Sequence, residues 1–153
     1  MVAVGKKLPA FSLPRSDGSA WKMSDSADGK LVLFFYPKAM TPGCTLEGQD
    51  FRDLHGAFKR ASTTVLGVSK DSCERHAKFR AKEKFPFELL SDEDEKVCRL
   101  FDVIREKSLY GRKFMGIERS TFLFGADGKL AREWRKVRVK GHAAEVLEAA
   151  KAP

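Results

Sequence analysis

The 153-residue sequence lacks the features of a membrane-spanning or exported protein. No apolar run approaches the roughly 20 residues that a membrane-spanning helix needs. The first residues, Met1 to Pro9, lack the basic-then-apolar order of a secretory signal. We therefore expect a cytoplasmic protein that does not bind membranes and that forms one compact domain over residues 1–153.

Cysteine and histidine are also scarce, with three of each. An odd cysteine count excludes a fully paired intramolecular disulfide framework, and no C-x-x-C pair occurs. The histidines His55, His76 and His142 are scattered, whereas the ligands of a structural zinc site usually come in closely spaced pairs. The sequence therefore predicts neither a metal site nor a cofactor.

Acidic residues are fewer than basic ones, which leaves a formal net charge of +8. Such a charge concentrates anions near the surface and favours nucleic acid, but no base-reading motif is visible. In the basic stretch from Arg132 to Lys140, Val137 and Val139 alternate with charged residues, as in a half-buried strand. We interpret the charge as a solvated surface, and a basic nucleic-acid-binding module is the distant alternative.

The spacing of apolar and turn residues predicts strands that alternate with helices. The expected strands are Phe11–Leu13, Ala20–Met23, Leu31–Tyr36, Thr64–Ser69, Phe87–Leu90, Ser120–Phe124 and Leu130–Val139. The expected helices run from about Cys44 to Lys59, from a cap at Asp71 or Ser72 to about Lys84, from Ser91–Glu95 through Phe101, and from about His142 to Lys151. This order predicts an α/β fold: a thioredoxin-like mixed central sheet, covered by helices on both faces, with an N-terminal hairpin extension.

The most informative segment runs from Phe35 to Thr45, where a buried strand is followed by a helix. In open α/β sheets, sites form beyond the carboxyl ends of strands. Two prolines and Gly43 predict a rigid turn that places Cys44 in the first helical turn. Unpaired N–H groups and the helix dipole stabilise a thiolate there. The hydroxyl of Thr41, three residues earlier, can reach the sulfur or a substrate oxygen.

We interpret Cys44 as a reactive thiol, although free cysteine is among the most buried residue types. A strand-to-helix turn flanked by threonine, proline and glycine is not a typical core position. Cys98 is different, because it lies between Val97 and Leu100 on an apolar helical face. We therefore expect Cys98 to be part of the core.

The run Pro37-Lys-Ala-Met-Thr41-Pro-Gly-Cys44 matches the peroxiredoxin pattern P-x-x-x-T/S-x-x-C. The sequence around it resembles the bacterioferritin comigratory protein (BCP, or PrxQ) subfamily, as do Leu89–Asp92, Glu106–Ser108 and Ile117–Leu123. The resemblance covers essentially the whole chain. It implies a thioredoxin-like domain of the AhpC/TSA type and a thiol-dependent peroxidase that reduces hydrogen peroxide and organic hydroperoxides to water and alcohols.

The resemblance also implies a role for each residue of the motif. Cys44 would attack the terminal peroxide oxygen and become a sulfenic acid. The Thr41 hydroxyl and the N–H groups of Gly43 and Cys44 would stabilise charge on the peroxide oxygens. Arg119, just before a late strand, would stabilise the thiolate and hold the substrate oxygen. Pro37 would shield the sulfur from water.

The sequence departs from the subfamily at the resolving cysteine. Many members carry it five residues after the nucleophile, where this chain has Gln49, and others near the position of Arg80. Cys73 lies on the same predicted helix as Arg80, but about two turns earlier. Two mechanisms stay open: a one-cysteine cycle completed by an external thiol, which we favour, and a two-cysteine cycle in which Cys73 resolves Cys44 after local unfolding.

The resemblance further implies thioredoxin, glutaredoxin or a low-molecular-weight thiol as the reductant, and a monomer or weak dimer. A second enzymatic hypothesis is a thiol–disulfide oxidoreductase of the same fold class. The missing C-x-x-C pair counts against that hypothesis.

Overall fold

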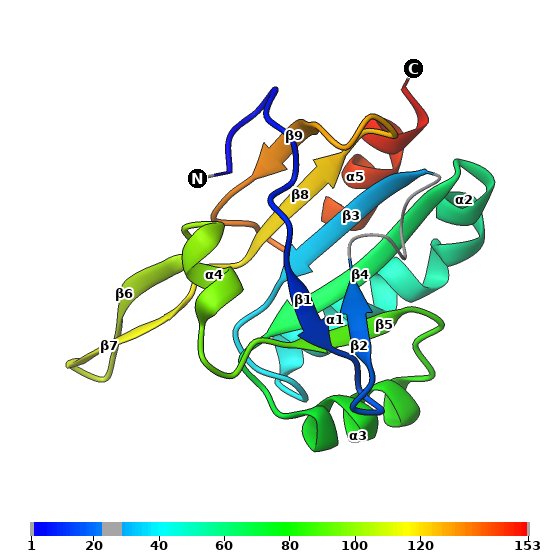
Figure 1. Ribbon diagram of the computed structural model, residues 1–153. Helices are drawn as coiled ribbons and strands as arrows, with labels where there is room; N and C mark the ends of the chain where they lie inside the picture. The colour runs from blue at the N-terminus through cyan, green and yellow to red at the C-terminus, as the bar shows by residue number, and fades with distance from the viewer. Residues whose placement is uncertain (1, 23–28, 153) are drawn as a thin grey trace.

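A computed structural model describes residues 2–22 and 29–152, and its core is a five-stranded sheet (Figure 1). The strands lie in the order β5-β4-β3-β8-β9. They are β3 (Lys30–Phe35), β4 (Thr63–Ser69), β5 (Glu88–Ser91), β8 (Ser120–Phe124) and β9 (Leu130–Trp134). Strands β3, β4 and β5 are parallel, and β8 is antiparallel to both of its neighbours. The predicted mixed sheet of a thioredoxin-like fold is therefore confirmed.

Strand β3 lies at the centre of the sheet because its sequence is apolar on both faces. Every residue from Leu31 to Phe35 is buried. Successive side chains of a strand point to opposite faces, and Leu33 and Phe35 accordingly join one apolar cluster while Val32 and Phe34 join another. The sheet therefore has a hydrophobic core on each side.

Helices cover both faces of the sheet, as predicted, but unequally (Figure 1). Four helices pack on the face of Val32 and Phe34: α1 (Pro42–Asp53), α2 (His55–Arg60), α3 (Cys73–Glu83) and α5 (His142–Lys151). The other face is covered by the short helix α4 (Lys96–Leu100) and by the N-terminal segment. None of the described helices has the length and apolar character that crossing a bilayer requires.

The predicted N-terminal hairpin is present as β1 (Ser12–Pro14) and β2 (Ala20–Lys22), which pair antiparallel. Its predicted last residue, Met23, lies outside the described residues. The predicted helix from Ser91 begins later, at Lys96, because Ser91 belongs to β5. The Asp92 carboxylate accepts the N–H groups of Val97 and Cys98, at 3.1 and 2.6 Å, and so caps α4.

The prediction of one helix from about Cys44 to Lys59 is wrong in its continuity. The first helix begins at Pro42, where the missing N–H of proline has no cost, so Cys44 lies in the first turn as predicted. It ends at Asp53, and the backbone of the next residue, Leu54 (φ −100°, ψ 4°), separates α1 from α2. Gly56, a poor helix former, follows at the start of α2 and weakens a continuous helix.

The hairpin of β6 (Ile104–Leu109) and β7 (Arg112–Ile117) was not predicted from the sequence. Its two turn residues, Tyr110 and Gly111, both have positive φ, at 51° and 77°. This is the backbone that tight two-residue hairpin turns require. Most side chains of the two strands are exposed or half-buried, so the hairpin lacks the apolar alternation of a core strand.

The strand predicted from Leu130 to Val139 ends at Trp134, so its second half was wrong. Lys136 has a φ of 53°, which an extended strand does not allow. Val137 and Val139 are half-buried, whereas Lys136, Arg138 and Lys140 are exposed, so the predicted burial pattern persists outside the strand.

Candidate active site

Cys44 lies in the first turn of α1, beyond the carboxyl end of β3. Thr41 has an extended backbone and is the N-cap of the helix, but its side chain makes no capping hydrogen bond. The first N–H groups of a helix have no acceptor within the helix. The N–H groups of Gly43 and Cys44 are thus available to a ligand at the sulfur. The Cys44 side chain itself is only 2% exposed.

The loop that leads into α1 is held by an ion pair from the start of α3. The Ala39 N–H donates to Asp71 Oδ2 at 2.8 Å, and Arg75 Nη2 donates to the Ala39 carbonyl at 3.1 Å. Asp71 and Arg75 also pair with each other at 3.1 Å. The next residue, Met40, has a φ of 65°, which costs about 1–2 kcal/mol in a non-glycine residue. The contacts to Ala39 offset that strain.

A buried hydrogen-bond network holds the carboxylate of Asp71 in position. The Ser69 hydroxyl donates to Asp71 Oδ2 at 2.6 Å and lies 2.7 Å from His76 Nε2. Because this hydroxyl has one proton, His76 must donate from Nε2 and accept the Ser91 hydroxyl at Nδ1, which is 2.9 Å away. Burial lowers the pKa of His76 to about 4, so the ring is neutral at pH 7.

Arg119, between β7 and β8, reaches the sulfur. Its Nη2 donates to Cys44 Sγ at 3.5 Å, and its Nη1 donates to Glu47 Oε1 at 2.6 Å. Its carbonyl accepts the Val137 N–H at 3.0 Å, which fixes the backbone. A Cβ on residue 43 would lie 3.1 Å from Nη2, so Gly43 leaves room for the guanidinium. The structure thus brings together Cys44, Gly43 and Arg119, which the sequence predicted for one site.

Glu47 also belongs to this site, although the sequence did not predict it as a site residue. It is 1% exposed, and its Oε2 has no hydrogen-bond partner among the described residues. Burial raises the pKa of Glu47 to about 7, although the charge of Arg119 acts in the opposite direction. The carboxyl group holds the guanidinium beside the sulfur. The one signal in the sequence was the spacing, since Glu47 follows Cys44 by three residues and shares its helix face.

Thr41 and Pro37 lie at the same turn with different environments. The Thr41 hydroxyl donates to the Lys38 carbonyl at 2.8 Å. Its proton is therefore committed to the loop, and its lone pairs are what it can offer to a peroxide O–H. Within the part of the chain that the structure describes, no hydrogen bond joins Thr41 to Cys44. Pro37 is half-buried at the end of β3.

All three cysteines are free thiols. Cys73 is half-buried at the first position of α3, whose cap is the Ser72 hydroxyl, an acceptor for the Arg75 N–H at 3.2 Å. Cys98 is fully buried, as expected of a core residue. Burial, together with the charge of Asp92, raises the pKa of Cys98 far above that of a free thiol.

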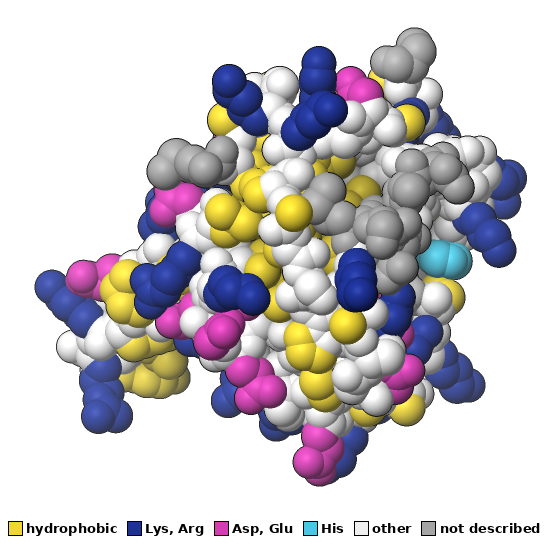
Figure 2. Space-filling view, in the orientation of Figure 1, with side chains coloured by type: hydrophobic (Ala, Val, Ile, Leu, Met, Phe, Trp, Pro, Cys, Tyr) yellow, Lys and Arg dark blue, Asp and Glu magenta, His cyan; other side chains and the backbone are white. Residues whose placement is uncertain are grey.

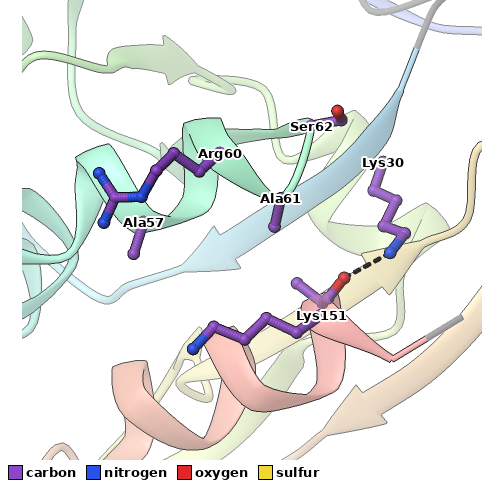
Figure 3. A pocket seen from close by; sticks show the side chains of 7 residues that line it. Lys30, Ala57, Arg60, Ala61, Ser62 and Lys151 are labelled. Atoms are coloured by element: carbon purple, nitrogen blue, oxygen red, sulfur yellow. Dashed lines mark hydrogen bonds between the residues drawn. The ribbon is translucent and has the colours of Figure 1, made fainter.

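A cavity of about 420 Å³ lies at the opposite end of the sheet (Figure 3). Lys30, the first residue of β3, reaches across it to the end of α5, where its ammonium donates to the carbonyl groups of Ala150 and, at 3.1 Å, Ala152. These contacts satisfy carbonyls that the helix end leaves unpaired. The lysine that lines this cavity therefore serves to hold the end of α5. The cavity takes no part in the Cys44 site.

Comparisons with known proteins agree on one family. The AhpC/TSA family matches residues 4–133. Peroxiredoxin Bcp of Bacillus subtilis is 47% identical over 98% of this chain and 96% of that protein. Peroxiredoxin Bcp of Xanthomonas campestris is 51% identical over 95% of this chain and 94% of that protein.

Solved structures give the same answer. A cysteine-to-serine mutant of PrxQ from Xylella fastidiosa superposes with a TM-score of 0.93 at 43% identity, covering 99% of this chain and 96% of that one. The bacterioferritin comigratory protein of X. campestris has a TM-score of 0.89 at 47% identity, covering 97% and 98%. The chain therefore belongs to the AhpC/TSA family, in its peroxiredoxin Bcp or PrxQ branch, and is a thiol peroxidase.

Proposed function

We propose that the chain reduces hydrogen peroxide and organic hydroperoxides with Cys44 as its only catalytic thiol, and that an external thiol completes the cycle. The observation that carries this proposal is the Arg119 guanidinium, 3.5 Å from Cys44 Sγ at the first turn of α1. Organic substrates are supported by the X. campestris relative, which is described as reducing alkyl peroxides.

In the first step, the Cys44 thiolate attacks the terminal oxygen of the hydroperoxide. A sulfur–oxygen bond forms, the O–O bond breaks, and the leaving oxygen takes a proton to become water or an alcohol. Negative charge grows on both oxygens as the bond breaks, so donors placed beforehand lower the barrier. Arg119 and the N–H groups of Gly43 and Cys44 supply these donors, Thr41 accepts from the peroxide O–H, and Pro37 limits access of water.

In the second step, a thiol attacks the sulfenic acid on Cys44 and releases water. The resulting disulfide is then opened by a second thiol. Thioredoxin, glutaredoxin or a low-molecular-weight thiol would supply both, with no metal or cofactor. Cys73 is the alternative resolver, but it sits inside the capped first turn of α3, between Asp71 and Arg75. Moving Cys73 to Cys44 would break the contacts that hold Ala39 in place.

Two measurements test the proposal. Cys44→Ser should abolish peroxide consumption while Cys73→Ser, its matched control, consumes the first equivalent at the parent rate. Non-reducing peptide mapping after one equivalent of peroxide should then find a sulfenic acid on Cys44. Retained activity in Cys44→Ser would refute the site, and a Cys44–Cys73 disulfide would replace the one-cysteine cycle by the two-cysteine cycle.

A further inference from the structure

Exposed apolar side chains gather on the β6–β7 hairpin. Six large apolar side chains are exposed among the described residues, and four of them are on this hairpin: Leu109 (57%), Tyr110 (95%), Phe114 (46%) and Met115 (54%). Figure 2 shows the hairpin as an arm that projects from the body, with yellow apolar atoms next to dark blue basic side chains. Single exposed apolar residues are ordinary, whereas a cluster marks a contact surface.

The pairing of the two strands divides the hairpin into two faces. Residues directly opposite each other in a ladder share a face, so Lys107 lies beside Phe114, and Leu109 beside Arg112. Met115 points to the other face, opposite Glu106. We call the first set, with Arg105 and Gly116, the Phe114 face.

The Phe114 face is a packed surface. A Cβ on residue 116 would lie 3.3 Å from the Phe114 ring and 3.5 Å from Lys107 Cδ. The ring and the lysine stem therefore both lie over Gly116, and the glycine gives them room. Lys107 is half-buried by this packing, although its neighbours Glu106 and Ser108 are exposed.

This face borders the Cys44 site. The chain passes from Ile117, the end of β7, to Arg119 in two residues, and Arg119 donates to Cys44. Lys107 is close enough to interact electrostatically with both Arg119 and Cys44. Burial lowers the pKa of Lys107, the charge of Arg119 lowers it further, and Cys44 acts in the opposite direction. A protein that rests on the Phe114 face is therefore next to the sulfur.

The charge of the hairpin selects the partner. The Phe114 face carries Arg105, Lys107 and Arg112 and no acidic residue. Arg105 is paired with Asp102, which leaves Lys107 and Arg112 to attract an acidic surface. A second copy of this chain would bring a like charge of +8 against the same face, which opposes self-association.

We propose that the Phe114 face docks an acidic dithiol protein of the thioredoxin type that reduces oxidised Cys44, an inference that rests on the proposed function. A small thiol can diffuse to Cys44 although that residue is only 2% exposed. A thiol carried by a protein needs a surface beside Cys44 to which that protein can bind. The partner's first thiol forms a disulfide with Cys44 as water leaves. Its second thiol then opens that disulfide, which returns Cys44 to the thiol and oxidises the partner.

The test compares two variants of the same strand. Phe114→Ser changes the proposed face, and Met115→Ser, its control, changes a side chain of similar exposure on the opposite face. Each protein is oxidised with one equivalent of peroxide, and its reduction is followed with a thioredoxin of negative net charge and with dithiothreitol. Phe114→Ser should slow thioredoxin about tenfold, as loss of an interface anchor does, and leave dithiothreitol and the peroxide step unchanged. Met115→Ser should change none of the three.

A charge variant gives a second measurement. Arg112→Glu should slow the thioredoxin step and reduce its dependence on salt, because complementary charge acts mainly on the association rate. Equal thioredoxin rates in the parent and in Phe114→Ser would overturn the docking proposal. It would also be overturned if the parent sediments as a dimer that Phe114→Ser dissociates, because a second copy then occupies the face. Failure of the proposed function has a different signature, namely no oxidation of Cys44 by peroxide in any of these proteins.

Discussion

Arg119 is expected to support both stability and catalysis, and the two contributions can be separated. Arg119→Ala leaves the carboxyl group of Glu47 unpaired at 1% exposure. Removing one partner of a buried ion pair costs about 3–5 kcal/mol. Burial already raises the pKa of Glu47 to about 7. Below that pH the carboxyl group is protonated and neutral, so it is destabilised less by the loss of its cationic partner. The loss of stability should therefore be larger at pH 8 than at pH 6.

The rate should fall for a different reason. Arg119 donates to Cys44 Sγ at 3.5 Å, and loss of one preorganised donor to a developing oxyanion costs about 10²–10³-fold in rate. In the double variant Glu47→Gln/Arg119→Ala, no buried charge is left without a partner. The double variant should therefore recover most of the stability and none of the rate. Urea unfolding at pH 6 and pH 8 measures the first quantity, and stopped-flow oxidation of Cys44 by hydrogen peroxide measures the second.

Two results would refute this reasoning. If the double variant recovers the oxidation rate together with its stability, Arg119 acts only by keeping Glu47 paired. If Arg119→Ala oxidises at the parent rate, the guanidinium has no part in the first step. A third variant, Glu47→Gln alone, is the control for the loss of the carboxylate, and it should keep a measurable share of the rate because Arg119 remains.

Three further predictions concern Cys73, the loop that leads into α1, and two buried histidines. Cys73→Ser should leave steady-state turnover with dithiothreitol nearly unchanged, and a large loss would favour Cys73 as the resolver. Asp71→Ala should slow oxidation of Cys44, because it leaves the buried Ala39 N–H without an acceptor, at a cost of about 1–3 kcal/mol, and so loosens the loop that leads into α1. Asp71→Asn keeps an acceptor oxygen and should keep most of the rate. Burial lowers the pKa of His76 and of His142 from 6.5 to about 4, so the unfolded chain binds more protons in this window. Each of these two histidines should therefore lower the free energy of unfolding by about 3 kcal/mol as the pH falls from 7 to 4. Glu47, whose pKa is raised in the folded state, should raise the free energy of unfolding by a similar amount over the same range. Urea unfolding across this range should therefore show a net loss in acid, and a flat profile would contradict it.

The fold was predictable where burial is continuous. The run from Leu31 to Phe35 is apolar at every position and reads directly as a central strand. The β6–β7 hairpin could not be predicted in this way, because its strands carry charged residues on both faces and project from the body. Its only local signal was Tyr110-Gly111, a turn pair without apolar alternation around it.

The site was predictable where it is local in sequence. Thr41, Gly43 and Cys44 come from one turn, so their proximity follows from the chain itself. Arg119 was assigned only by resemblance to a family, since nothing in its own neighbourhood distinguishes it from a surface arginine. Asp71 had been expected only as a helix cap, because its contact with the loop that leads into α1 joins segments 32 residues apart.

The residue at the missing resolver position is consistent with the proposed dependence on an outside thiol. Gln49 Nε2 donates to Glu83 Oε1 at 2.8 Å and so ties α1 to the end of α3. Arg52 donates to the Glu83 carbonyl at 2.8 Å, and the Phe85 ring packs so closely on Gly48 that a Cβ there would overlap it. A cysteine at position 49 could reach Cys44 only if α1 unwound, and each of these contacts opposes unwinding. Gln49 therefore leaves no thiol at this position and stabilises the helix that would have to open. Under the proposed one-cysteine cycle, the surface beside Cys44 is then where the cycle is completed.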